Sequence, residues 1–309
     1  MLSRIAESLY WIGRNVERAE DTCRILDVHL QLLVEDASVD TQLSAATLYA
    51  VLGMPPPKGP VTSEEVLRTI QYHPTAPCSV LASLGAARES ARRARETVPP
   101  EMWESLNTTW NAVRAVELRR QRPLAALAFV RERCVLISGI ADTTMSHDDG
   151  WQFLQLGRQI ERVDMIARLI LWASVNRRSA SAWNNALRAS GALHAFRRTH
   201  GAATLGRDAA EFLLLDRLFP RSVVHALTMA EDALAELEPG ARRSGFPSEG
   251  LRLLGRARAE LEYQSLSEVL YELPDRLAHL QQVCVEVDAA ITQRYFVGAA
   301  SPAWSGGAV

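Results

Sequence analysis

Apolar residues recur every three or four positions along most of this chain, which is the spacing of one face of an α-helix. The clearest stripe lies between residues 3 and 35, and no proline interrupts it. Its members are Ile5, Leu9, Ile12, Val16, Ala19, Cys23, Leu26 and Leu30. The period-two alternation of a half-buried strand is nearly absent. The pattern predicts an all-α fold, a multi-helix bundle of roughly ten helices with no sheet.

Prolines, glycines and capping residues divide the remaining pattern into shorter helices. A second long helix is expected over 149–175, and single helices are expected over 100–121, 181–198 and 251–271. The connections between them are short, so neighbouring helices should pack antiparallel. The tail 298–309 is rich in Gly, Ala and Ser, and we expect it to be disordered.

The two long segments resemble each other. Residues 13–26 read GRNVERAEDTCRIL and residues 157–170 read GRQIERVDMIARLI, an offset of 157 − 13 = 144. A glycine, a glutamate and three arginines are identical, and the apolar register is kept. The repeat predicts a single domain over 1–297, built from pseudo-repeated halves 1–147 and 148–297 that share one core.

Both copies place a glycine in the middle of a helix, where it costs about 1 kcal/mol relative to alanine. Such a glycine usually marks the close approach of another backbone. We therefore expect the long helices to cross near Gly13 and Gly157. An approximate two-fold at that crossing would bring Glu17, Arg18 and their counterparts together near the centre of the fold.

The composition excludes several classes of protein. Of 309 residues, 48% are hydrophobic and 23% are charged, and the net charge is −2, so no basic bias favours nucleic acid or anionic lipid. No apolar run is long enough to cross a membrane, and Glu7 and Arg14 interrupt any secretory signal. The four cysteines lie far apart, which is typical of reduced, buried thiols in a cytoplasmic protein.

Several stretches together resemble one protein family. They are LSRIAESLYWIGRNVERAEDTCRIL at the start, SVLASLGAARESARRARETVPPEMWESLN (79–107), DDGWQFLQLGRQIERVD (148–164), LLLDRLFPRSVVHAL (213–227) and the C-terminal helix ending in Tyr295-Phe296. They resemble the Alpha-E family, a bacterial all-helical domain named for its ER motif. The family signature falls on Glu17-Arg18 and Glu161-Arg162.

The resemblance also implies partners. Members of the family occur beside, or fused to, a circularly permuted ATP-grasp protein, often with a transglutaminase-like protein and sometimes with a proteasome-like peptidase. This company implies ATP-dependent formation of amide or peptide bonds. We therefore expect a helical partner of an ATP-grasp amide ligase, which binds the ligase or its carboxylate-bearing substrate. A stand-alone enzyme acting on a small peptide or amino-acid derivative, and a purely structural scaffold, remain alternatives.

The candidate site residues lie on the two repeated helices. They are Arg14, Glu17, Arg18, Arg158, Glu161 and Arg162. Arginines one helical turn apart can hold a carboxylate or phosphate through paired hydrogen bonds, so these residues could line a ligand or partner cleft. Alternatively, each glutamate pairs with an arginine and the charges only pin the helix crossing. The sequence leaves both interpretations open and assigns no catalytic residue.

Two other motifs and several absences complete the picture. His147-Asp148-Asp149 could ligate a metal, but an aspartate cap on the following helix is favoured. In LDRLFPRS (215–222), Asp216 and Arg221 could pair across the turn, and Pro220 would start the next helix. No phosphate-binding glycine loop, HExxH, repeated ExxH or nucleophile elbow occurs. We therefore expect no cofactor and no metal.

Overall fold

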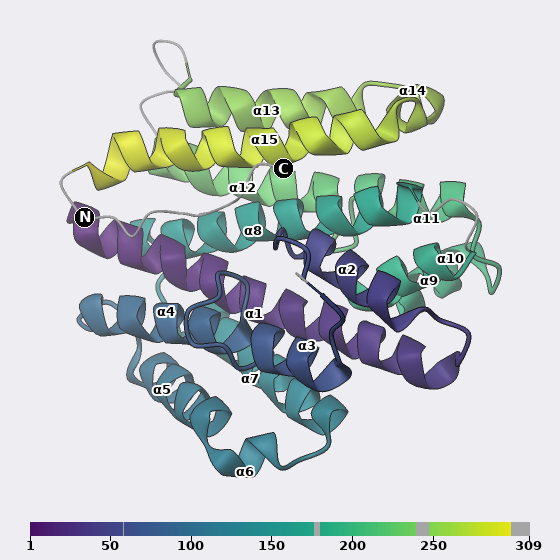
Figure 1. Ribbon diagram of the computed structural model, residues 1–309. Coiled ribbons are helices and arrows are strands. Elements are labelled where there is room, and N and C mark those ends of the chain that lie inside the picture. The colour runs from purple at the N-terminus through teal and green to yellow at the C-terminus, as the bar shows by residue number, and fades with distance from the viewer. Residues whose placement is uncertain (58, 176–179, 239–246, 298–309) are drawn as a thin grey trace.

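The fold is all-α, as predicted. The computed structural model describes residues 1–57, 59–175, 180–238 and 247–297, which form fifteen α-helices and no strand (Figure 1). The helices are α1 (Ser3–Glu35), α2 (Thr41–Val51), α3 (Ser63–Ile70), α4 (Val80–Arg93), α5 (Pro100–Arg114), α6 (Val116–Arg119), α7 (Pro123–Thr144), α8 (Asp149–Val175), α9 (Ala180–Ala189), α10 (Leu193–His200), α11 (Gly206–Leu215), α12 (Val223–Leu237), α13 (Glu249–Glu262), α14 (Leu266–Leu270) and α15 (Leu273–Ile291).

The two long helices, α1 and α8, lie side by side through the middle of the molecule (Figure 1). Helices α4 and α7 pack on α1, and α5 packs on both of them. Helices α12 and α15 pack on α8, and α13 packs on both of them. Helices α2 and α9 lie near the far ends of the long pair, where each contacts both α1 and α8. Each long helix is therefore surrounded by a similar set of neighbours.

The turns that precede α4 and α12 also have the same hydrogen bonds. The side chain of Ser79 donates to the carbonyl of His73, and the side chain of Ser222 donates to the carbonyl of Asp216. Each serine then caps its helix by accepting a backbone N–H three residues later. In each half, the serine bonds to the carbonyl six residues before it. The matching turns agree with an internal repeat, although the duplication itself stays a prediction.

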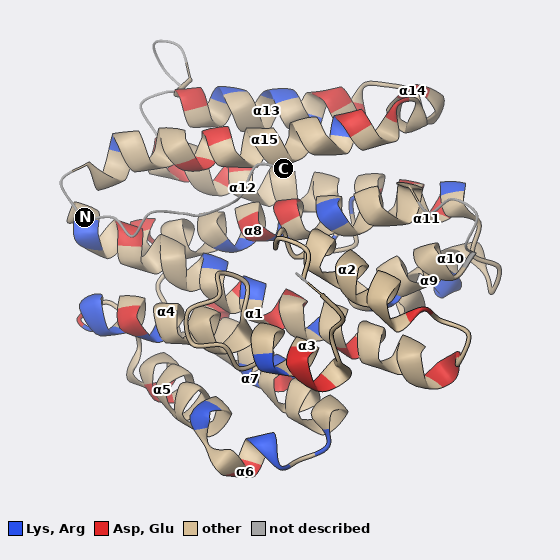
Figure 2. Cartoon of the chain, viewed as in Figure 1, with Lys and Arg blue, Asp and Glu red and all other residues tan. Residues whose placement is uncertain are grey.

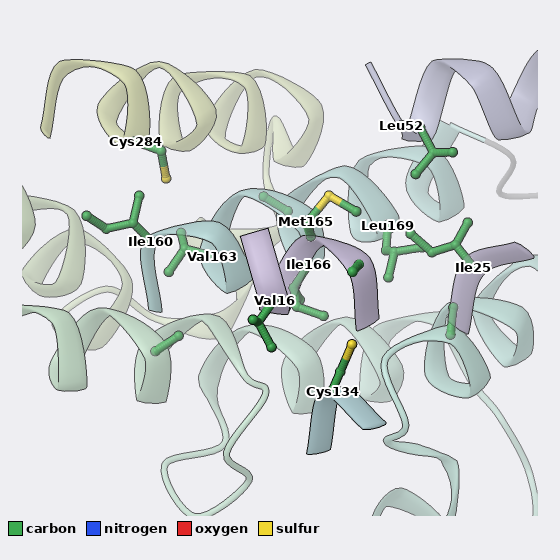
Figure 3. Close-up of a cluster of buried hydrophobic side chains, with 14 of the residues drawn as sticks. Val16, Ile25, Leu52, Cys134, Ile160, Val163, Met165, Ile166, Leu169 and Cys284 are labelled. Carbon is green, nitrogen blue, oxygen red and sulfur yellow. The ribbon is translucent and has the colours of Figure 1, made fainter. Parts of the chain in front are cut away.

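One hydrophobic cluster runs through the molecule. In Figure 3, Val16 of α1 and Cys134 of α7 lie on one side of α8, and Cys284 of α15 lies on the other. The predicted stripe on α1 faces this cluster, with only Leu30 partly exposed. The four cysteines are unpaired, and all but Cys78 are buried. Charged residues of both signs alternate along the helices and do not segregate by sign (Figure 2).

The structure has more helices than the roughly ten expected, in part because three predicted helices are each divided in two. Ala115 adopts an extended backbone between α5 and α6, and Gly191 has a positive φ of 69° between α9 and α10. Ser265 begins α14 with a capping box completed by Glu268. At Ala115, propensity and apolar spacing continue across the break, so the pattern gives no sign of it. Gly191 and the Ser265-x-x-Glu268 sequence are boundary signals that the expected limits passed over. The expected disordered tail lies outside the described residues.

Candidate functional site

The long helices touch where both carry glycine. A Cβ atom added to Gly13 would lie 2.0 Å from the carbonyl oxygen of Leu154, and one added to Gly157 would lie 2.1 Å from that of Tyr10. No side chain larger than hydrogen fits at either position, because both neighbours are backbone atoms. The predicted crossing at these glycines is therefore confirmed. It places the two ER motifs directly against each other, one turn further along each helix.

At the crossing, each motif pairs with the other. Arg18 donates from Nε and Nη2 to the two carboxylate oxygens of Glu161, at 2.6 and 2.9 Å. Arg162 donates in the same way to Glu17, at 2.7 and 2.9 Å. Both pairs have the two-pronged geometry that makes arginine–carboxylate contacts strong and directional. The arginine of one copy thus binds the glutamate of the other, in both directions.

A second arginine binds Glu161. The Nε of Arg14 donates to Glu161 at 2.9 Å, and its Nη1 donates at 2.6 Å to Asp288 on α15. The hydroxyl of Tyr10 donates to the same oxygen of Asp288 at 2.7 Å. Arg14 is among the most buried side chains of the protein. It is therefore held between two carboxylates in the interior and does not face solvent.

A second arginine also binds Glu17, and it comes from the turn before α12. Nη1 of Arg221 lies 3.0 Å from Oε1 of Glu17, and the same guanidinium also pairs with Glu20 and Asp21. The expected Asp216–Arg221 pair is therefore wrong. Asp216 instead accepts the backbone N–H groups of the two residues at the tip of its own turn. The helix also starts later than expected, with Ser222 as its cap and not Pro220 at its first turn.

Arg158 departs from the symmetry of the other five predicted residues. Its Nη1 donates to Asp142 of α7, at 3.1 and 3.2 Å, and not to Glu17. The structure thus brings Arg14, Glu17, Arg18, Glu161 and Arg162 into one cluster and leaves Arg158 at its edge. We call these five residues, with Arg221 and Asp288, the ER cluster.

The two glutamates of the ER cluster are ionised despite their burial. Both are at most 2% exposed. Burial alone raises the pKa of Glu17, but the charges of Arg162 and Arg221 outweigh it and hold the pKa at about 2. The same balance, with Arg18 and Arg14, lowers the pKa of Glu161 to about 2. Removing a single arginine would leave a buried carboxylate undercompensated.

The charges of the ER cluster are balanced by carboxylates within the protein. Each glutamate receives two arginines, and the further positive charge is met by Asp288 on one side and by Glu20 and Asp21 on the other. An external carboxylate could make the same two-pronged contact with Arg18 or Arg162 only by displacing the internal glutamate. The geometry therefore favours the interpretation in which the charges pin the helix crossing. Binding of a ligand at these residues stays a prediction.

The motif before α8 is a helix cap. Oδ1 of Asp148 accepts the N–H of Gly150 at 2.9 Å, and the carbonyl of Asp148 accepts the N–H of Gln152. The ring of His147 stacks on Trp151 with centroids 3.9 Å apart. Among the residues that the structure describes, no three His, Cys, Asp or Glu side chains are grouped to hold a metal.

Sequence reasoning missed three members of this region. Arg221 belongs to the LDRLFPRS segment (215–222), but its partner Asp21 on α1 is 200 residues away in sequence. Asp288 carries a detectable signal, because it is an acidic residue in register with the buried Cys284 and Ile291. Asp142 carries none, since it is one of many acidic residues on half-exposed helix faces.

The fold and the cluster define a class of protein: an all-helical domain organised around two crossing helices that exchange glutamate–arginine pairs. The chain belongs to the Alpha-E family, described as a predicted alpha-helical domain with a conserved ER motif, which matches residues 1–296. Glu-Arg dipeptides occur in this chain at 17–18, 132–133 and 161–162, and the first and third are those expected to carry the motif.

Relatives occur in mycobacteria. An uncharacterised protein of Mycobacterium bovis and one of Mycobacterium tuberculosis are each 25% identical to this chain over 340 aligned positions. The alignments cover 97% of this chain but 38% of each relative, so the chain spans about two-fifths of the length of the curated relatives it matches. No solved structure matches the chain. None of the described helices combines the length and apolar character needed to cross a bilayer.

Proposed function

We propose that this protein is a helical partner of an ATP-grasp amide ligase, acting in the cytoplasm where ATP is available. The observation that carries the proposal is the length of the mycobacterial relatives, in which a domain like this one is joined to a much longer polypeptide. Covalent joining in some proteins is typical of domains that work together as separate chains in others. The resemblance noted in the sequence implies an ATP-grasp protein and a transglutaminase-like protein as the expected company.

The proposal has two forms: the ER cluster either keeps the core rigid or binds the substrate. The cluster supports the first form better. Because Glu17 and Glu161 each bind two arginines, the cluster suits a device that keeps α1 and α8 in one fixed arrangement. A rigid core lets the outer helices present a constant surface to the ligase. In the other form, Arg18 or Arg162 exchanges its glutamate for the carboxylate of the substrate. The side chains of both are 12% exposed, so a substrate would reach them only at the edge of the cluster.

Copurification from the native host tests the partnership. The chain carries an affinity tag, and the ATP-grasp protein of the same host is quantified in the eluate by mass spectrometry. Enrichment over a tagged unrelated helical protein is the expected result. The purified pair is then assayed for ADP release and amide product with and without this chain. Absence of both the complex and any change in ligase rate would contradict the proposal.

A conservative pair of variants separates the two forms. Arg18→Lys keeps the charge but loses the two-pronged contact with Glu161. Arg92→Lys, on an exposed pair with Glu89, is the matched control. If the cluster only holds the fold, Arg18→Lys lowers the melting temperature while the folded protein still supports the ligase at the wild-type rate. If Arg18 binds the substrate, the KM for the carboxylate substrate rises in the folded variant. A scaffold with no ligase partner, which the internally paired cluster also favours, predicts no effect of either variant on the ligase.

A further inference from the structure

A cavity of about 310 Å³ lies away from the ER cluster, between the last turns of the long helices and the helices α2 and α9. Its volume is within the range of small-molecule sites, which begins at about 300 Å³. Two walls come from equivalent positions of the repeat, since Ile25 and Leu169 each follow their crossing glycine by twelve residues.

The crossing explains why space exists here. Two helices that touch at Gly13 and Gly157 separate as they run on, and twelve residues correspond to about 18 Å of helix. Helices α2 and α9 cover the gap, and α9 lines it with the polar residues Ser181 and Asn185 and with three alanines, whose side chains are too small to fill it. The alanines are Ala182, Ala186 and Ala189. The cavity therefore follows from the geometry of the crossing and is not a local packing defect.

The walls are mostly apolar and the loop side is acidic. Leu48 and Trp172 are among the apolar residues that line the cavity, and Asp36 and Asp40 line it from the loop between α1 and α2. None of the described lining residues is a lysine or an arginine. An apolar body is therefore accommodated by the walls, and a positive charge is favoured at the loop.

The two aspartates have an oxygen to spare. Oδ1 of Asp40 accepts the N–H groups of Gln42 and Leu43, and Oδ1 of Asp36 accepts the N–H and hydroxyl of Ser38. The described residues donate no hydrogen bond to Oδ2 of either carboxylate. The bonds from Ser38 also lower the pKa of Asp36, which is thus ionised at neutral pH.

A histidine in the wall does not oppose a cation. His29 lines the cavity. Its Nδ1 shares a hydrogen bond with the hydroxyl of Ser44, and its Nε2 has no partner among the described residues. Burial lowers the pKa of His29 from 6.5 to about 4. The imidazole is therefore neutral at pH 7, and among the described lining residues the charged side chains are the two carboxylates.

We infer that this cavity binds a small molecule with an aliphatic or aromatic body and an ammonium group, the body between Ile25, Leu169 and Trp172 and the ammonium at Asp36 and Asp40. The body removes apolar surface from water, which is the main source of affinity, and the carboxylates select the sign of the charge. The site is independent of the ligase partnership, because it is tested on the isolated chain.

Three probes of similar size and different charge test the inference. They are 4-phenylbutylamine, 4-phenylbutanol and 5-phenylpentanoate, each titrated into the full chain by calorimetry at pH 7 and low salt. The amine should bind about tenfold more tightly than the alcohol, and the acid should bind more weakly than either. Equal binding of all three, tighter binding of the acid, or no binding of the amine would overturn the inference.

Two sets of variants locate the site. Thr47→Trp fills the cavity from α2, and Ala50→Trp places the same ring on the exposed side of that helix as a control. Binding of the amine should disappear in the first and persist in the second. Asp36→Asn with Asp40→Asn removes both charges and keeps the helix cap, since asparagine also caps. It should weaken the amine about tenfold and leave the alcohol unchanged. The assignment is wrong if Thr47→Trp, or the double variant Asp36→Asn with Asp40→Asn, binds the amine as tightly as wild type and has a wild-type circular dichroism spectrum.

Discussion

Replacing Gly13 by alanine should destabilise the protein strongly, although helix propensity alone predicts the opposite. In the interior of an ordinary helix this change stabilises by about 1 kcal/mol, because alanine has less backbone freedom to lose. At Gly13 the new Cβ would lie 2.0 Å from the carbonyl oxygen of Leu154, whereas real Cβ contacts essentially never fall under 3.0 Å. The helices α1 and α8 must therefore separate by about 1 Å, since the obstacle is backbone and cannot rotate away.

The separation has two costs. Overpacking at a tight contact typically costs about 1–3 kcal/mol. The same movement lengthens the bonds from Arg18 and Arg162 to their glutamates, which are 2.6–2.9 Å and hold charges in the interior. Complete loss of a partner in a buried ion pair costs about 3–5 kcal/mol, and a stretch of this size removes part of that. We expect a net destabilisation of about 3–5 kcal/mol, well above the usual effect of one substitution.

Urea unfolding followed by circular dichroism at 222 nm measures this change. The matched control is Gly139→Ala on α7, another glycine inside a helix, where an added Cβ meets nothing within 4 Å. The control should be more stable than wild type by about 1 kcal/mol. The two variants thus shift the unfolding midpoint in opposite directions. If Gly13→Ala is as stable as the control, the close crossing and the reasoning built on it are wrong.

Three further predictions concern buried ionisable side chains. Arg162→Ala should destabilise by about 3 kcal/mol in urea unfolding, because Glu17 then keeps one arginine of two, whereas Arg92→Ala on an exposed pair should cost under about 1 kcal/mol. His29 should make stability fall as the pH falls from 6.5 to about 4, by up to about 3 kcal/mol, because only the unfolded chain binds a proton there; His29→Asn should remove this slope, and an unchanged slope would contradict the assignment. Glu161 should add a second loss, of about 3 kcal/mol, as the pH falls from 4.5 to about 2, where its stabilising charge is neutralised; acid unfolding of Glu161→Gln that matches wild type would refute this.

The local pattern determined the two long helices. Their predicted limits, 3–35 and 149–175, agree with α1 and α8. An unbroken apolar period and the polar segments that end it are properties of neighbouring residues, so no distant contact is needed to recognise them. The repeated glycines predicted the crossing for a similar reason. A residue that lowers helix propensity at the same place in two helices indicates a packing requirement.

The partners of the charges were decided by tertiary structure. On α1, Glu17 lies one turn from Arg14 and beside Arg18, and spacing alone allows many pairings. In the structure its partners are Arg162 and Arg221, which lie 145 positions or more away in sequence. Only the arrangement of the helices determines which guanidinium reaches which carboxylate.

The difference between the two halves also required the tertiary structure. Arg14 and Arg158 occupy equivalent places in the repeat, yet Arg14 is enclosed between Glu161 and Asp288 while Arg158 turns to Asp142. The local sequences around the two arginines are too similar to predict this. Their surroundings differ because α15 supplies a buried carboxylate beside one of them and α7 supplies a half-exposed one beside the other. The environment of a charge depends on what packs over it, and that is determined by helices far away in the chain.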